Sequence, residues 1–153
     1  MTDIFPKSFL VDTNILVYLS DKNSQFYLPT LHFFEKSERE NIKLVVAHQS
    51  ILELTRTLVK DYQLNFTQAT QKSRLITYDE KFEVIFPLYS TLHTYYKIAK
   101  NKNKIGNVFD LYLAATALDN GINNIVTNNP IDFTKIPNFK AFSLEDLRTL
   151  VKK

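Results

Sequence analysis

Short apolar runs alternate along this chain with longer stretches whose apolar residues recur at helical spacing. Residues 42–47, Ile-Lys-Leu-Val-Val-Ala, have the length and the β-branched content of a buried strand. Residues 49–60 follow with a helical period. The predicted core face of this helix consists of Ile51, Leu52, Thr55, Leu58 and Val59. The pattern therefore predicts units of one strand followed by one helix that repeat along the chain.

The same reading covers the remaining residues. It predicts strands at 8–12, 42–47, 82–86, 124–127 and 140–142. It predicts helices at 13–19, 28–39, 49–60, 67–77, 88–100 and 108–120, and a short last helix capped by residues 143–146. Gly121 stands where a helix C-terminus favours glycine. Alternating strands and helices indicate an α/β fold, a three-layer sandwich with a mostly parallel sheet of about five strands. We expect one domain over residues 1–153.

Composition narrows the class of protein. The chain has no cysteine, which excludes disulfides, thiolate catalysis and Cys-type zinc sites and suits a reducing cytoplasm. Its two glycines, Gly106 and Gly121, are too few for a Walker loop or a dinucleotide fingerprint. Asp3 and Pro6 interrupt the region where a signal peptide needs an apolar stretch. We expect a soluble cytoplasmic protein without a membrane partner, whose net charge of +3 permits an anionic ligand.

Acidic residues stand at similar places in several strand–helix units. Asp12 ends the first strand, and Glu53 lies one turn into the helix after the second, on the face away from Ile51, Leu52 and Thr55. Asp110 opens the helix at 108–120, and Asp132 follows the fourth strand. Ligands of open α/β sheets collect at the carboxyl ends of strands. We therefore expect these carboxylates to share one site.

Each acid also has an ordinary structural explanation. Asp12 could cap a helix, Glu53 could form a surface ion pair with Arg56, and Asp110 could be a first-turn acid. Asp132 could be a turn residue. The order of all four along the chain favours a joint site.

Several carboxylates brought together favour a hard divalent cation. Mg²⁺ takes oxygen ligands, one or two carboxylates among them. The three histidines, His32, His48 and His93, show no metal-ligand spacing. Oxygen donors without His or Cys select Mg²⁺, or Mn²⁺, over Zn²⁺. The predicted cofactor is therefore Mg²⁺ or Mn²⁺.

Four motifs resemble the PIN-domain family, specifically the VapC-type toxin ribonucleases of type II toxin–antitoxin pairs. The motifs are Leu-Val-Asp-Thr-Asn-Ile-Leu at 10–16, Ser-Ile-Leu-Glu-Leu at 50–54, Asp-Leu-Tyr-Leu-Ala-Ala-Thr-Ala at 110–117 and Ile-Val-Thr-Asn-Asn-Pro-Ile-Asp-Phe at 125–133. The resemblance implies a PIN-like fold and a Mg²⁺-dependent endoribonuclease held in check by a small antitoxin protein. It also implies a homodimer.

The resemblance also implies roles for individual residues. Asp12 and Asp110 would be the principal Mg²⁺ ligands, with Glu53 as a third acidic member. The family's fourth carboxylate often stands two residues after Thr127, where this chain has Asn129, so either Asn129 or Asp132 would complete the set. The residues implied to orient the site are Thr13, Asn14, Thr127 and Asn128.

The expected reaction is hydrolysis of an RNA phosphodiester by a metal-activated water, leaving a 5′-phosphate and a 3′-hydroxyl. The basic residues suggested for RNA binding are Lys97, Lys100, Lys102 and Lys104, which could equally be a solvated helix end and loop. Two alternatives stay open. One is a PIN-fold RNA-binding protein without catalysis. The other is a haloacid-dehalogenase-type phosphatase, which needs a second acid where this chain has Asn14.

Overall fold

The computed structural model describes residues 5–100 and 107–149, and at its centre lies a fully parallel sheet of five strands. The strands are β1 (Ser8–Val11), β2 (Lys43–Ala47), β3 (Phe82–Ile85), β4 (Asn124–Val126) and β5 (Lys140–Phe142). Their order in the sheet is β3-β2-β1-β4-β5. From the central strand β1, the chain adds β2 and β3 on one side of the sheet. It then crosses back and adds β4 and β5 on the other side of β1. This reversal between β1 and β4 is where open α/β sheets bind ligands.

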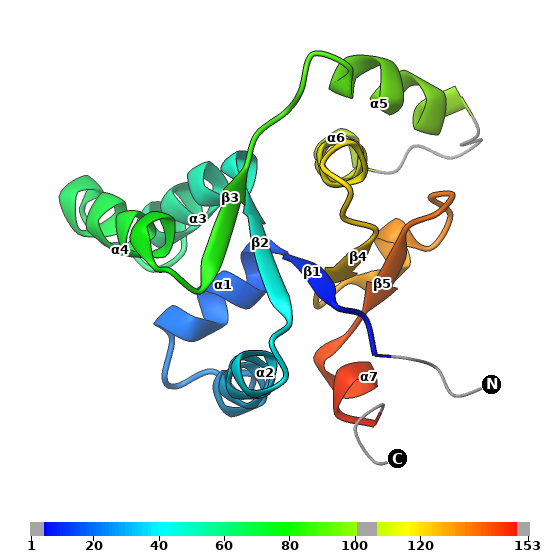
Figure 1. Cartoon of the computed structure of the whole chain (residues 1–153). Helices are drawn as coiled ribbons and strands as arrows, with labels where there is room; N and C mark the ends of the chain where they lie inside the picture. The colour runs from blue at the N-terminus through cyan, green and yellow to red at the C-terminus, as the bar shows by residue number, and fades with distance from the viewer. Residues whose placement is uncertain (1–4, 101–106, 150–153) are drawn as a thin grey trace.

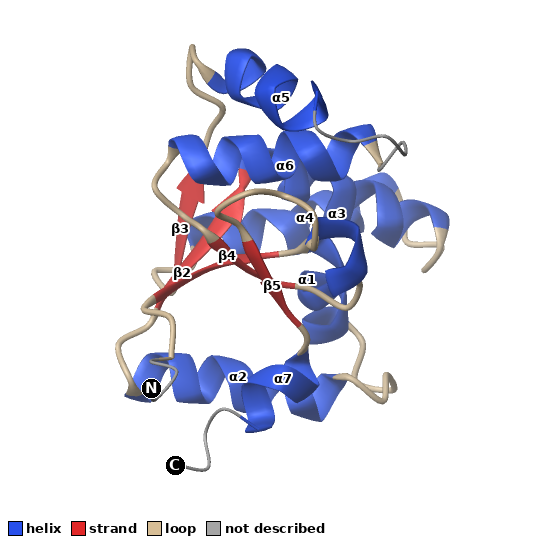
Figure 2. Ribbon diagram, turned by 90° about the vertical axis from the view of Figure 1, so that its right-hand side faces the viewer, coloured by secondary structure: helices blue, strands red, loops and turns tan. Residues whose placement is uncertain are grey.

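Helices cover both faces of the sheet (Figures 1 and 2). One side carries α1 (Thr13–Ser20), α2 (Tyr27–Arg39), α3 (His48–Lys60), α4 (Phe66–Tyr78) and α7 (Leu144–Thr149). The other side carries α5 (Thr91–Lys100), α6 (Val108–Asp119) and the 3₁₀ helix η1 (Pro130–Phe133). The predicted three-layer α/β sandwich is confirmed. None of the helices in the described ranges is long and apolar enough to cross a membrane.

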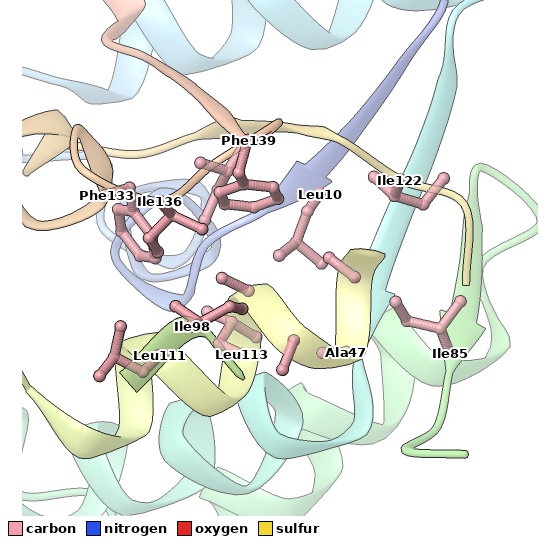
Figure 3. Close-up of a cluster of buried hydrophobic side chains, with 14 of the residues drawn as sticks. Leu10, Ala47, Ile85, Ile98, Leu111, Leu113, Ile122, Phe133, Ile136 and Phe139 are labelled. Atoms are coloured by element: carbon pink, nitrogen blue, oxygen red, sulfur yellow. The ribbon is translucent and has the colours of Figure 1, made fainter. Parts of the chain in front are cut away.

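The two faces of β1 supply two separate hydrophobic cores. Phe9 and Val11 are fully buried among α1, α2 and α3, whereas Leu10 points to the opposite core, under α6. Figure 3 shows Leu10 facing Leu113 of α6 and Phe139 of the loop before β5. Successive residues of a strand face opposite sides of the sheet, so a strand buried on both faces is apolar throughout.

Helix α5 begins three residues later than the pattern suggested. The predicted start was Leu88, but the Thr91 hydroxyl accepts a hydrogen bond from the Leu88 N–H at 2.8 Å, and the helix begins at Thr91. The hydroxyls of Thr91 and Thr94 also donate to the Asp119 carboxylate of α6, at 3.1 and 2.7 Å. These contacts fix α5 on α6. The strand predicted at 140–142 matches β5, and the other predicted elements differ from the observed ones by one residue at one or both ends, as boundary assignments ordinarily do.

The predicted core face of α3 was partly wrong. Leu52 is 61% exposed, and Thr55 is only partly buried, hydrogen-bonded to Ser73 of α4. Leu58 is buried as predicted, and Ile51 and Val59 pack partly buried against the same core. The other buried side chains are Ser50 and Leu54, which the predicted face did not include. Leu54 did not enter the predicted face because several apolar residues of this helix fit more than one helical stripe, and only packing against the sheet chooses among them.

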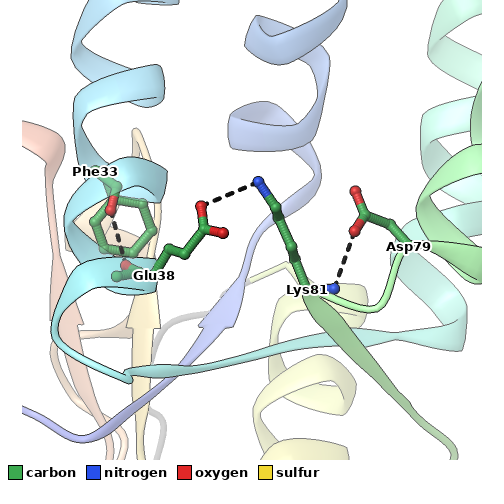
Figure 4. Close-up of polar contacts among 5 residues, drawn as sticks. Phe33, Glu38, Asp79 and Lys81 are labelled. Carbon is green, nitrogen blue, oxygen red and sulfur yellow. Dashed lines mark hydrogen bonds and ion pairs between the residues drawn. The ribbon is translucent and has the colours of Figure 1, made fainter.

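Polar contacts tie the edge of the sheet to α2 (Figure 4). Lys81, just before β3, donates from its ammonium to Glu38 of α2 at 3.2 Å and from its backbone N–H to Asp79 at 2.9 Å. The Ser37 hydroxyl bonds the Phe33 carbonyl at 2.8 Å. The Lys81–Glu38 pair is solvent-exposed, so it contributes on the order of 0–1 kcal/mol, and stability rests on the two cores.

We predict that Leu10→Ala lowers the free energy of unfolding by about 2–5 kcal/mol, because it opens a cavity in the core between β1 and α6. Leu10 is completely buried. Urea denaturation followed by circular dichroism measures the change. The matched control is Leu75→Ala on α4, where the side chain is 72% exposed, and we expect a change within about 0.5 kcal/mol. Equal effects of the two substitutions would contradict this description of the core.

Candidate functional site

A cleft of about 900 Å³ opens at the carboxyl ends of β1 and β4, where the strand order reverses. It lies between α1, α3, the start of α6 and η1. Its lining includes Asp12, Thr13, Asn14, Glu53, Asp110, Asn129 and Asp132. The structure therefore brings the three predicted acids, and both candidates for a fourth ligand, into one cleft.

Asp12 lies directly after β1 and caps the N-terminus of α1. Its backbone N–H donates to the Val126 carbonyl at 3.1 Å, which continues the β1–β4 pairing to the last residue before the helix. Its Oδ1 accepts the Thr13 N–H at 2.7 Å. Its Oδ2 accepts the Thr127 hydroxyl at 2.7 Å and the Asn14 amide at 3.2 Å. Three donors from two elements hold the carboxylate in one orientation.

Burial raises the pKa of the Asp12 carboxyl, because the side chain is only 9% exposed. The negative charge of Glu53 raises this pKa further, while the hydrogen bonds from Thr127, Thr13 and Asn14 act in the opposite direction. The pKa of Tyr18, which lines the same cleft, is also raised, first by burial and then by the charge of Asp12. An ionised side chain at either position is therefore destabilised by the surroundings of the cleft.

Glu53 is held from two sides. Its Oε2 accepts the Thr13 hydroxyl at 2.9 Å, and its Oε1 accepts the Gln49 amide at 2.8 Å. Ion pairs among the described residues do not include a Glu53–Arg56 pair, so the surface-pair explanation of Glu53 is not realised. Thr13 contacts the carboxylates of both Asp12 and Glu53 and lies between them.

Asp110 occupies the first turn of α6. Asn107 caps this helix, and its side chain accepts the Phe109 N–H at 3.0 Å. The Asp110 side chain is half-buried and lines the cleft from the side opposite α1. A helix N-terminus carries a partial positive charge, which favours the ionised form of an acid in the first turn.

The segment after β4 is tied to the Asp12 side of the cleft. The Asn14 amide also donates to the Thr127 hydroxyl oxygen at 3.3 Å, and the Asn14 carbonyl oxygen accepts the Asn128 N–H at 3.2 Å. The Thr127 oxygen accepts the Asn129 N–H at 3.1 Å. The Asn14 side chain thus holds both Asp12 and this segment. A haloacid-dehalogenase-type enzyme would have its second acid at the position of Asn14. Asn129 and Asp132 both line the cleft with exposed side chains, so the geometry leaves both available as a fourth ligand.

The donor chemistry of the cleft suits a hard divalent cation, because its acids and amides offer only oxygen ligands. Asp12 Oδ1 and both oxygens of Glu53 each accept one of the hydrogen bonds described and keep further acceptor capacity, whereas Asp12 Oδ2 accepts two. Within residues 5–100 and 107–149, no three His, Asp or Glu side chains lie close enough together to form a metal-binding group. The three acids line the same cleft, and Thr13 lies between the carboxylates of Asp12 and Glu53.

The predicted RNA-binding lysines are not part of the cleft lining that the structure describes. Lys97 and Lys100 are exposed on α5, and Lys102 and Lys104 lie outside the described residues. His48 stacks its ring on Phe86 at 5.0 Å between centroids, which is a packing role.

Two residues at the site were not singled out as functional in the sequence: Arg56, which lines the cleft, and Gln49, which contacts the cleft residue Glu53. Gln49 holds Glu53, and a polar residue four positions before an acid on a helix was the only available signal. Arg56 is the basic side chain among the described residues that line the cleft. The sequence indicates for Arg56 only an ion pair with Glu53.

The PIN domain family model matches residues 9–138 of the chain. This range contains both strands that form the cleft and every residue of the predicted ligand set. The chain belongs to the PIN domain family. A search of curated protein sequences found no significant match.

Solved structures with the same fold come from toxin–antitoxin systems. VapBC2 from Rickettsia felis, bound to a DNA fragment from its promoter, superposes with a TM-score of 0.65 at 24% identity, covering 89% of this chain and 98% of that chain. FitAcB from Neisseria gonorrhoeae gives 0.68 at 16% identity, with coverages of 90% and 98%. Mycobacterium tuberculosis VapC20, a sarcin–ricin loop cleaving toxin, gives 0.62 at 10% identity, with coverages of 86% and 98%. At these identities the likeness establishes the fold.

We predict that Asp12→Asn stabilises the metal-free protein at neutral pH. The pKa of Asp12 is higher in the folded than in the unfolded chain, so ionisation of this group disfavours folding. The resulting loss of folding free energy is absent below the pKa that Asp12 has in the unfolded chain, and it grows as pH rises through the pKa that Asp12 has in the folded protein. The uncharged amide of the Asn variant removes this loss. Thermal unfolding in a chelator from pH 4 to pH 8 should show the variant's Tm advantage at the upper end and its loss toward the lower end. A Tm difference that does not change with pH would contradict the conclusion that ionisation of Asp12 destabilises the fold.

Proposed function

We propose that this chain is a Mg²⁺- or Mn²⁺-dependent endoribonuclease and the toxin of a toxin–antitoxin pair. The observation that carries the proposal is the convergence of Asp12, Glu53 and Asp110, from three different segments, on the cleft at the strand reversal. Membership of the PIN domain family and the fold shared with VapBC and FitAB proteins support it.

The proposed ligands are Asp12, Glu53 and Asp110, with Asn129 or Asp132 as a fourth. Bound Mg²⁺ would supply Lewis-acid chemistry at the phosphodiester and make water nucleophilic at neutral pH. Thr13 orients Asp12 and Glu53 through its backbone N–H and its hydroxyl. Thr127 and Asn14 hold the other oxygen of Asp12, which leaves Oδ1 with acceptor capacity beyond the Thr13 N–H. A divalent cation would also relieve the cost of the buried Asp12 charge.

An anionic substrate suits the remaining side chains of the cleft. The Arg56 guanidinium, one turn beyond Glu53 on α3, is placed to pair with a phosphate group. Tyr62 and Phe109 are exposed aromatic rings in the lining, and such rings stack on unpaired bases. Metal-activated water does not require the 2′-hydroxyl, so a preference for RNA would come from these shape and stacking contacts.

The proposed protein partners are a small antitoxin and a second copy of the chain, in the cytoplasm. The antitoxin is proposed because VapBC and FitAB structures are complexes of two partners. Support for a homodimer comes from exposed large apolar side chains concentrated between β3 and the middle of α5. These are Phe86, Leu88, Tyr89, Leu92 and Tyr96. Apolar surface of this kind is typical of protein interfaces.

A PIN-fold RNA-binding protein without catalysis is the alternative to test. The metal-binding groups are separated within the described residues, which a non-catalytic protein would tolerate. The nuclease is preferred because three acids from separate segments line one cleft, and a bound cation would offset their mutual repulsion.

We predict that Asp12→Asn and Asp110→Asn each abolish RNA cleavage while the protein stays folded. Loss of outer-shell partners of a metal already costs about 10–100-fold, so loss of a proposed ligand should lower kcat by more than about 100-fold. Cleavage of structured RNA on denaturing gels, with Mg²⁺ or Mn²⁺ and with a chelator, measures this. Glu53→Gln should be severe and Asp132→Asn mild.

The matched control is Glu80→Gln, the same loss of charge on an exposed residue outside the cleft, which should cleave like the wild type. Full activity of the Asp12 or Asp110 variant would refute the proposed ligand set. End-group analysis adds a check on mechanism: the expected products carry a 5′-phosphate and a 3′-hydroxyl, and a 2′,3′-cyclic phosphate would exclude the metal-activated water.

We predict that expression of the chain alone arrests bacterial growth, and that co-expression of its antitoxin relieves the arrest. The antitoxin should bind across the cleft and place a basic side chain among Asp12, Glu53 and Asp110, because a cation there offsets their mutual repulsion. Growth curves with the wild type and with Asp12→Asn test the first point. Harmless expression of a protein that cleaves RNA in vitro would remove the toxin role and leave the nuclease role standing.

A further inference from the structure

The Gln49 side chain joins the two helices that carry Glu53 and Asp110. Gln49 lies in the first turn of α3, one helical turn before Glu53. Its Nε2 donates to Glu53 Oε1 at 2.8 Å and to the Phe109 backbone carbonyl of α6 at 3.2 Å. An amide nitrogen has two hydrogens, and these two acceptors use both. The orientation of the amide is therefore determined, because a flipped amide would face both acceptors with an oxygen.

The oxygen of the same amide has no partner among residues 5–100 and 107–149. Gln49 Oε1 is buried and makes no hydrogen bond within these ranges. Leaving a buried carbonyl oxygen without a donor costs stability, and such groups in folded proteins call for a specific explanation. An apolar side chain of the same length would avoid this cost. The benefit of glutamine at this position must therefore lie in the two bonds from its nitrogen.

Those two bonds connect helices that pack on opposite faces of the sheet. Glu53 belongs to α3, which packs on α1 and α4, whereas α6 covers the opposite face of the sheet. The Phe109 carbonyl immediately precedes Asp110. The amide thus restrains the Glu53 carboxylate relative to the backbone that carries Asp110, and Glu53, Phe109 and Asp110 all line the cleft.

We propose that Gln49 is a positioning residue that sets the separation of Glu53 and Asp110 and so the affinity of the cleft for a divalent cation. The inference rests on the proposed function, in which both acids are ligands. Gln49 itself does not touch the cation or the RNA. It acts by restricting the Glu53 side chain to one orientation relative to the start of α6, as hydrogen-bonded partners of metal ligands commonly do.

The test uses Gln49→Met, which keeps the length of the side chain, removes the amide nitrogen and removes the unpartnered buried oxygen. Two measurements are made on the full chain: Mn²⁺ binding by isothermal titration calorimetry without RNA, and steady-state RNA cleavage. We expect Mn²⁺ affinity to fall about 10–100-fold and kcat to fall in parallel at low Mn²⁺, while KM for RNA stays unchanged. The Tm should stay close to that of the wild type, because the lost bonds and the removed oxygen have opposite effects.

Gln71→Leu, a change of an exposed glutamine on α4, is the matched control and should leave all three quantities unchanged. Gln49→Asn provides a second variant, since its amide is one methylene too short to reach both acceptors. It should weaken Mn²⁺ binding as well, which keeps the test decisive if the methionine variant does not fold.

A double-mutant cycle separates positioning from general damage. If Gln49 acts through Glu53, Gln49→Met should cost little further Mn²⁺ affinity in a Glu53→Gln background. Additive losses, or wild-type Mn²⁺ affinity in the single variants, would overturn the positioning role while leaving the nuclease intact. A fall in Tm without a change in Mn²⁺ affinity would overturn it as well. A wild-type protein that neither binds Mn²⁺ nor cleaves RNA would refute the proposed function and this inference together.

Discussion

The structure depends on one carboxylate, that of Asp12, held in a buried position between β1 and β4. Its backbone N–H extends the parallel pairing of these strands, and its two oxygens accept hydrogen bonds from the start of α1 and from Thr127. The same group thus ends a strand, begins a helix and joins the two halves of the sheet. An ionised carboxylate in this position is costly unless its partners are in place, so the surrounding residues form a closely connected polar network.

The position of that network follows from the topology of the sheet. β1 is central, and the chain adds β2 and β3 on one side before it returns to add β4 and β5 on the other. The loops after β1 and β4 leave in different directions, which opens a cleft at the carboxyl ends of these strands. The apolar residues of β1 serve both cores, so the strand that delivers Asp12 is also rigidly packed on both faces. A precise site requires such support.

Stability and chemistry compete in this cleft. Burial and the neighbouring Glu53 charge raise the pKa of Asp12, and the buried oxygen of Gln49 lacks a partner in the part of the chain that the structure describes. Both features reduce the stability of the fold, and both lie in the same small region. Proteins accept such local costs where a ligand or a reaction repays them. The large cores beneath α6 and between α1, α2 and α3 supply the stability that makes these costs tolerable.

The sequence by itself determined the layers of the fold and the identity of the acids. Strand and helix periods follow from local side-chain patterns, and the buried strand before Asp12 and the cap at Gly121 are local signals. The tertiary structure decided the rest. It chose Leu54 rather than Leu52 for the core, because helix stripes become distinct only when a sheet packs on one of them. It also brought Gln49 to the Phe109 carbonyl, sixty residues away along the chain. No local pattern encodes this contact, because it forms only when two helices on opposite faces of the sheet meet at its edge.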